Sequence, residues 1–220
     1  MIEVPDRKGS PVSSSSRATV VRTERPAAPR STGIFLLIAA VLGLAAAFEL
    51  ILSELKVLRD PLGELACDIN PLITCSTSLL SGQSRLLFDI PNSLIGIMAF
   101  TALATFAVII ISRVNLPRWV WWCMGAGTLV GVTYVAFFLH VSINVFQGLC
   151  PYCMLVWVAT LATTVLVWAQ ILSSGMAGES AVPAGRSIQR YWWLILLLLL
   201  LIIAVIIAIG LTEQISMVFG

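Results

Sequence analysis

The sequence predicts an all-α integral membrane protein with five transmembrane helices. Of its 220 residues, 59% are hydrophobic and only 11% are charged, whereas charged residues make up about 25% of a soluble domain. This composition excludes soluble globular, disordered and fibrous proteins. The apolar residues fall into five segments of about 20 residues, the length that a helix needs to cross a bilayer core of about 30 Å. Backbone polar groups in lipid must be satisfied within each segment, and the short alternating segments of a β-barrel are absent, so each segment is expected to be helical.

The elements follow one another along the chain after a polar start. Residues 1–32 are rich in Ser, Pro, Ala and Arg and show no apolar period, which predicts a disordered tail. The five predicted helices cover residues 33–53, 91–111, 119–139 with an extension toward 146 left open, 150–172 and 191–210. A long loop, 54–90, joins the first two, and its apolar residues predict that part of it lies on the membrane surface. Residues 173–190 are expected to form a cytoplasmic linker, and the chain ends in a short outer tail.

Lysine and arginine are unevenly distributed between the two sides of the membrane. Ten of the 13 lie in the N-terminal tail and in the connections after the second and fourth predicted helices, whereas Lys56, Arg59 and Arg85 lie in the loop 54–90. The positive-inside rule therefore places the N-terminus in the cytoplasm, and the loop 54–90 and the turn 140–150 on the outer face. The net charge is only +2, which gives no indication of nucleic acid binding.

Four of the five cysteines fall on the predicted outer face. Cys67 and Cys75 lie in the loop 54–90, and Cys150 and Cys153 open the fourth helix. The topology rests on arginine and lysine alone, so its agreement with the cysteine positions is independent evidence. Disulfides persist outside the cytosol. Cys123 lies near the inner end of the third helix, where we expect a buried, small apolar residue without a chemical role.

The Cys150-Pro151-Tyr152-Cys153 tetrapeptide predicts a reactive, reversible disulfide. A cysteine at a helix start lies over unpaired amides and the positive end of the helix dipole, which favour the thiolate. A thiolate of low pKa is a good leaving group in thiol–disulfide exchange. A disulfide across Cys-x-x-Cys constrains the chain little, so a purely structural role is disfavoured.

The loop cysteines leave several alternatives open. Asn70-Pro71 favours a turn, which brings Cys67 and Cys75 together or lets one of them reach Cys150. A static disulfide that holds the loop is the structural alternative. A zinc site is disfavoured because a spacing of eight residues is outside the usual ligand pattern. Asp68 is expected to raise the pKa of the neighbouring Cys67 through its charge.

The order of these motifs resembles the vitamin K epoxide reductase family. The resemblance rests on Cys67-Asp68-Ile69-Asn70-Pro71 to Cys75, on Pro91-Asn92-Ser93-Leu94-Ile95-Gly96 and on the Cys-x-x-Cys tetrapeptide, and it covers residues 33–172. The chain is most similar to bacterial, actinobacterial-type members. The resemblance implies a four-helix bundle around a quinone, with the fifth helix peripheral.

The resemblance also implies an activity and its partners. Electrons from a separate thioredoxin-fold (DsbA-like) protein on the outer face of the bacterial plasma membrane would enter at Cys67 and Cys75. They would pass to Cys150 and Cys153 and on to a quinone, of which menaquinone suits the bacterial resemblance, with Cys153 nearest the quinone. Such an enzyme supports disulfide formation in exported proteins. No metal or flavin is expected, and which loop cysteine faces the partner stays open.

Four further residues are candidates for quinone contacts. Asn92 and Ser93, at the start of the second helix, match family positions beside the quinone, although residues of these types also cap helices. Trp157 stands where vertebrate members have a tyrosine and can stack on a quinone ring; without a phenol it favours simple quinone reduction over epoxide reduction. Phe88 is expected to cover the pocket.

Two other functions are compatible with parts of the pattern. The DsbB-type membrane oxidases carry Cys-x-x-Cys in the first outer loop and the spaced pair in the second, which is the reverse of the order here. A non-enzymatic membrane scaffold with structural disulfides is the alternative from another class.

Overall fold

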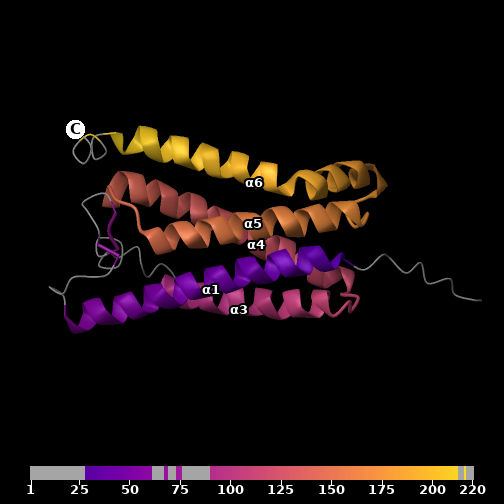
Figure 1. The fold of residues 1–220 in the computed structure, drawn as a ribbon, viewed down its shortest axis with the longest axis horizontal. Helices are drawn as coiled ribbons and strands as arrows, with labels where there is room; N and C mark the ends of the chain where they lie inside the picture. Colours follow the sequence, from indigo (N-terminus) through magenta and orange to yellow (C-terminus); the bar gives the residue numbers. More distant parts are fainter. Residues whose placement is uncertain (1–27, 61–66, 69–72, 76–89, 213–215, 217–220) are drawn as a thin grey trace, which may run out of the picture.

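The computed structural model describes residues 28–60, 67–68, 73–75, 90–212 and 216. Five helices within this part of the chain are long and apolar enough to cross a membrane. They run side by side along one axis (Figure 1). The predicted all-α membrane fold is therefore confirmed.

Helices α1 (Arg30–Arg59) and α3 (Asn92–Ile111) form a close antiparallel pair. Alanine and glycine lie on the buried side of α1, which allows two helices to approach closely in lipid. The approach is tightest at Gly43, where an added Cβ would come within 2.4 Å of the Phe100 ring. Near the ends of the pair, a Cβ on Gly33 would meet Ile111 and one on Gly96 would meet Ala47.

Helix α5 (Pro151–Ser173) is the centre of the bundle. It packs against α1, α4 (Arg118–Val141) and α6 (Val182–Gly210), and it is the most buried of the five spans. Far from the loop cysteines and the Cys150–Cys153 tetrapeptide, α1, α3, α4 and α5 share one apolar core, which includes Leu36, Ile110, Trp121, Leu166 and Ile171. A four-helix bundle core is thus present, and α6 lies outside it along α5 (Figure 1).

Helix α6 begins nine residues earlier than predicted, so most of the predicted linker is helical. Pro183 stands in its first turn, where a proline is well tolerated. A Cβ on Gly185 would lie 2.2 Å from the Ser173 amide nitrogen, so this turn rests directly on the end of α5. Tyr191 interrupts the helix with φ −112° and ψ 22°. The predicted start therefore coincides with a kink rather than with the beginning of the helix.

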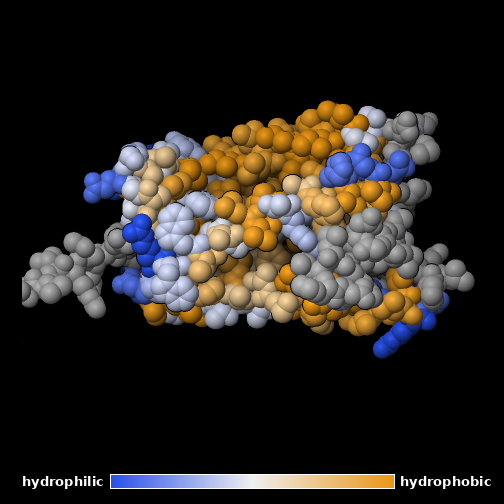
Figure 2. Space-filling model, turned by 180° about the vertical axis from the view of Figure 1, so that it is seen from behind, coloured by the Kyte–Doolittle hydropathy of each residue, from blue (hydrophilic) through white to orange (hydrophobic). Residues whose placement is uncertain are grey.

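The two ends of the bundle differ in charge. Arg30, Arg113, Arg118, Arg186 and Arg190 belong to the end away from the cysteines, and Lys56 and Arg59 to the cysteine end. Apolar side chains cover the middle of the face shown in Figure 2, and polar ones gather toward both ends. The last two turns of α1, placed by prediction in the loop 54–90, are helical up to Arg59.

Candidate active site

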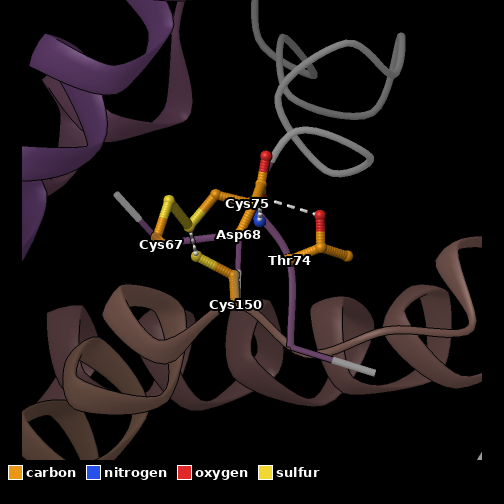
Figure 3. Close-up of a disulfide and its surroundings, with 5 residues drawn as sticks. All are labelled: Cys67, Asp68, Thr74, Cys75 and Cys150. Atoms are coloured by element: carbon orange, nitrogen blue, oxygen red, sulfur yellow. Dashed lines mark hydrogen bonds between the residues drawn. A yellow bond between two sulfur atoms is a disulfide. The ribbon is translucent and has the colours of Figure 1, made fainter. Parts of the chain in front are cut away.

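Three cysteines meet at one end of the bundle. Cys67 and Cys75 form a disulfide with a Cα–Cα distance of 5.8 Å. The Sγ of Cys75 lies 3.2 Å from the Sγ of Cys150 (Figure 3). All three side chains are buried. Of the two arrangements that the sequence left open, the structure contains both: the loop cysteines are paired, and one of them contacts Cys150.

A short backbone pairing holds the loop segment 73–75 in place. Ile73 and Leu149 form an isolated parallel β-bridge, and the Thr74 amide donates a 3.0 Å hydrogen bond to the Leu149 carbonyl. Cys75 and Cys150 each follow this pairing directly along the chain. The bridge therefore sets the two sulfur atoms opposite each other.

Asp68 bonds the segment that carries Cys75. One carboxylate oxygen accepts a 2.7 Å hydrogen bond from the Cys75 amide and a 2.8 Å hydrogen bond from the Thr74 hydroxyl (Figure 3). From the sequence, Asp68 was expected to raise the pKa of Cys67 through its charge. In the structure its carboxylate instead holds Cys75 in position through hydrogen bonds.

Helix α1 covers the sulfur atoms from the side. Leu50 and Val57 lie on one face of the last turns of α1. They pack in one apolar cluster with Cys67, Cys75 and Cys150. The continuation of α1 beyond residue 53 thus has a direct effect on the site. It gives the exchanging sulfurs an apolar wall.

Cys150 is the N-cap of α5, and Pro151 is the first helical residue, as the sequence predicted. A side-chain hydrogen bond with Cys153 lowers the pKa of Cys150, and backbone hydrogen bonds from Cys153 and Tyr152 lower it further. Burial and the negative charge of Asp68 oppose this effect. The net direction is a lowered pKa, which favours the thiolate that attacks disulfides.

A π-helical segment, η2 (Ser142–Phe146), links α4 to the turn before Cys150. The predicted extension of the third helix toward residue 146 is therefore present, with altered geometry. Gln147 adopts the left-handed conformation (φ 52°), and the Ser142 hydroxyl donates a 2.5 Å hydrogen bond to the Gly148 carbonyl. This closed turn directs Leu149 and Cys150 back toward the bundle. Single π-helical turns occur frequently at functional sites.

A small pocket lies behind Cys150, between α4, η2 and the first turns of α5. It is lined by Phe138, Ser142, Phe146, Gly148, Cys150, Cys153 and Trp157. Cys153 therefore lies between the exchanging sulfurs and an aromatic pocket. The cavity volume is only about 10 Å³, room for about one water molecule, so a larger ligand requires the surrounding side chains to move.

The predicted quinone contacts divide into three groups. Trp157 is buried and lines the pocket. Asn92 and Ser93 form the first turn of α3 and are not among the lining residues, although the Ser93 hydroxyl is buried and has no hydrogen-bond partner in the described part of the chain. Phe88 lies outside the described residues.

Cys123 is not buried, contrary to the prediction. It is exposed on α4, because the buried side of this helix carries Val120, Trp121 and Met124 instead. Cys123 is a free thiol in the second turn of α4, at the end of the helix away from the other four cysteines. Within the described residues, no group of three or more His, Cys, Asp or Glu side chains is arranged to hold a metal ion.

Three residues near the site were not predicted from the sequence. Thr74 and Ser142 each donate one hydroxyl hydrogen bond, to Asp68 and to the Gly148 carbonyl, a role that leaves no recognisable motif. Tyr134 places its hydroxyl in the bundle without a hydrogen-bond partner among the described residues. Its spacing of four residues from Phe138 puts both rings on one helix face, and this spacing could have been noticed.

Comparisons with known proteins agree with this geometry. A search of curated proteins found no match. The family model described as "Vitamin K epoxide reductase family" matches residues 34–168, which include all four clustered cysteines, the pocket and helices α3 and α4. The match covers more than half of the chain. This protein therefore belongs to the vitamin K epoxide reductase family.

Proposed function

We propose that this protein is a membrane disulfide:quinone oxidoreductase that reoxidises a separate thioredoxin-fold protein. Members of its family are thiol–disulfide oxidoreductases, and the family uses quinones in general. The observation that carries the proposal is the 3.2 Å contact between Cys75, within the Cys67–Cys75 disulfide, and Cys150. A static disulfide that only holds the loop would not need a low-pKa cysteine against it.

The first exchange takes place at the loop. A thiolate of the partner attacks the Cys67 sulfur, the Cys67–Cys75 bond breaks, and Cys75 leaves as a thiolate. The partner's second thiolate then attacks its own mixed disulfide and releases Cys67. The partner has lost two electrons and two protons, and the loop holds two thiols. We assign Cys67 to the partner because Cys75 is the loop cysteine in contact with Cys150.

The second exchange takes place at the helix start. The Cys75 thiolate attacks Cys150 in a Cys150–Cys153 disulfide, and Cys153 leaves as a thiolate. Cys67 then attacks Cys75 and releases Cys150, which restores the loop disulfide. The lowered pKa of Cys150 makes it a good leaving group in this last step. The resulting arrangement, with a loop disulfide and free Cys150 and Cys153, is the one that the structure contains.

The residues around Cys153 are chemically suited to a quinone. The pocket offers aromatic faces from Phe138, Phe146 and Trp157, and the buried hydroxyl group of Tyr134 lacks a partner among the described residues. When bound, a quinone accepts two electrons and two protons and so restores the Cys150–Cys153 disulfide. Because the pocket is small, the ring requires the aromatic side chains to shift on entry. The bacterial resemblance supports menaquinone and the outer face of a plasma membrane.

The experiment that tests this function follows electrons from thiol to quinone. Purified protein in lipid nanodiscs is given a reduced thioredoxin-fold oxidase and menaquinone without oxygen, and quinol formation is followed by absorbance. We expect Cys150→Ala and Cys153→Ala to abolish quinol formation, and Cys123→Ala to retain it, because Cys123 is exposed away from the site. Full activity of either Cys150→Ala or Cys153→Ala would contradict the proposal.

A further inference from the structure

Tyr134 places a hydroxyl group in the interior of the helix bundle. Its oxygen is buried and has no hydrogen-bond partner among the described residues. A polar group that leaves water without a partner is unfavourable, so such groups are rare and call for an explanation. The side chain lies in the middle of α4, where lipid surrounds the bundle and water is scarce.

The position of Tyr134 connects it to the pocket. Tyr134, Phe138 and Ser142 follow at intervals of four residues, so they share one face of the helix. The rings of Tyr134 and Phe138 lie in contact, with centroids 4.9 Å apart. Phe138 and Ser142 line the pocket. Tyr134 therefore forms the next layer below it.

The packing of α4 on α5 brings the phenol to the cysteine side. Gly131 faces Thr160 closely, since an added Cβ would come within 2.9 Å of Thr160 Cγ2. The two helices run in opposite directions, so Tyr134, one turn after Gly131, is level with Trp157, one turn before Thr160. The phenol is also close enough to Cys153 for the two groups to interact electrostatically.

A comparison with Trp168, another aromatic residue with a buried donor, distinguishes the environment of Tyr134. The indole nitrogen of Trp168 is also buried without a partner among the described residues. It lies near the opposite end of α5, against the common apolar core and far from any described cysteine pair. Of the two ring donors without a partner in the described part of the chain, Tyr134 is the one that lies beside the pocket and Cys153.

We propose that the Tyr134 hydroxyl donates a hydrogen bond to a carbonyl oxygen of a quinone in this pocket and so holds the ring beside Cys153. This inference rests on the proposed quinone acceptor. A carbonyl oxygen supplies the acceptor that the apolar neighbours of Tyr134 lack. The phenol then acts as a binding residue and takes no part in the exchange of sulfur bonds.

The test measures binding rather than turnover. Full-length protein is oxidised at all its cysteine pairs and mixed with 2,3-dimethyl-1,4-naphthoquinone, which has no free ring position for thiols to attack. Carbon-13 labels at its carbonyls give infrared bands that fall in frequency when an oxygen accepts a hydrogen bond. We expect one lowered band with the wild-type protein and its return to the free frequency with Tyr134→Phe. Affinity should fall about three- to tenfold, the usual effect of one neutral hydrogen bond.

Tyr191→Phe is the matched control, because it makes the same chemical change at the kink of α6, at the other end of the bundle. It should alter neither the band nor the affinity. The Tyr134→Phe ring retains its contact with Phe138, so thermal stability should be unchanged. A second measurement keeps the hydroxyl group. When 3-fluorotyrosine replaces Tyr134, its fluorine NMR chemical shift should change on addition of the quinone, whereas 3-fluorotyrosine in place of Tyr191 should show no change.

The outcomes separate the two proposals. If wild-type protein binds the quinone and Tyr134→Phe leaves both the band and the affinity unchanged, the role of Tyr134 is wrong and the quinone acceptor stands. If wild-type protein binds no quinone, the proposed acceptor fails and the role of Tyr134 fails with it.

Discussion

The contact between Cys75 and Cys150 gives the two loop cysteines different roles. The sulfur atoms of Cys75 and Cys150 lie 3.2 Å apart. The Ile73–Leu149 bridge and the hydrogen bond from the Cys75 amide to Asp68 hold them in this position. Thiol–disulfide exchange requires the attacking sulfur to reach its target directly. Cys75 is therefore the cysteine suited to exchange with Cys150, and Cys67 the one suited to exchange with a partner.

This assignment predicts different oxidation products in two serine variants. With Cys153→Ala as the common background, mild oxidation of Cys67→Ser should accumulate a Cys75–Cys150 disulfide, because neither Cys67 nor Cys153 remains to break it. In the same background, Cys75→Ser should keep Cys67 and Cys150 as free thiols. Alkylation followed by peptide mass spectrometry distinguishes these products. A Cys67–Cys150 disulfide in Cys75→Ser, at a yield similar to the first product, would reverse the assignment.

The lowered pKa of Cys150 predicts how its reactivity depends on pH. With the loop disulfide intact, the alkylation rate of Cys150 should reach half of its maximum at a lower pH than the rate of an unperturbed cysteine does, because its pKa is lowered. Cys153→Ala removes the hydrogen bond that lowers the pKa most, so its midpoint should rise. Asp68→Asn keeps one oxygen that can accept both the Cys75 and the Thr74 hydrogen bonds but removes a charge that raises the pKa of Cys150, so the Cys150 midpoint should fall.

These two shifts have opposite signs, which makes the prediction specific. Rates are followed on the Cys150 peptide by mass spectrometry, so that Cys123 and Cys153 do not contribute. Equal midpoints in the wild-type protein and in both variants would show that neither group acts on the Cys150 thiolate.

At the scale of the helices, the sequence predicted which segments cross the membrane but not all their ends. Hydropathy identified each span. The charged residues Glu54, Lys56 and Arg59 led to the prediction that α1 ends at residue 53, whereas the helix continues to Arg59. That turn is helical because Leu50 and Val57 pack against the cysteines, a contact with residues that come later in the chain. The start of α6 at Val182 depends in the same way on the contact between Gly185 and the end of α5.

The close contact between α1 and α3 at Gly43 predicts a stability difference between two glycines. Gly43→Ala should destabilise the fold by about 1–3 kcal/mol, the usual effect of overpacking, because its Cβ would lie 2.4 Å from the rigid Phe100 ring. Gly127→Ala on α4 meets nothing within 4 Å and should be neutral or slightly stabilising. Unfolding in mixed detergent micelles compares the two. Equal stabilities would mean that α1 and α3 do not pack as described.

At the scale of the whole molecule, the uneven distribution of charge predicted the architecture well. The distribution of arginine and lysine predicted that four cysteines lie on the same side of the membrane. Cys67, Cys75, Cys150 and Cys153 do lie together. The sulfur that contacts Cys150 could not be predicted. It depends on a pairing of Ile73 with Leu149, 76 residues apart, for which two isolated apolar residues give no sequence signal.

The position of all four cysteines at one end of the bundle has a consequence for bioenergetics. Every proposed exchange step takes place there, and Cys153 is only one turn into α5. Electrons and their protons then enter and leave near the same membrane face, so almost no charge crosses the electric field of the membrane. A charge that crossed fully would be affected by about 2.3 kcal/mol per 100 mV. In proteoliposomes, a potassium diffusion potential set with valinomycin should therefore leave the rate of quinone reduction unchanged, and a several-fold change would show that charge crosses the bilayer during turnover.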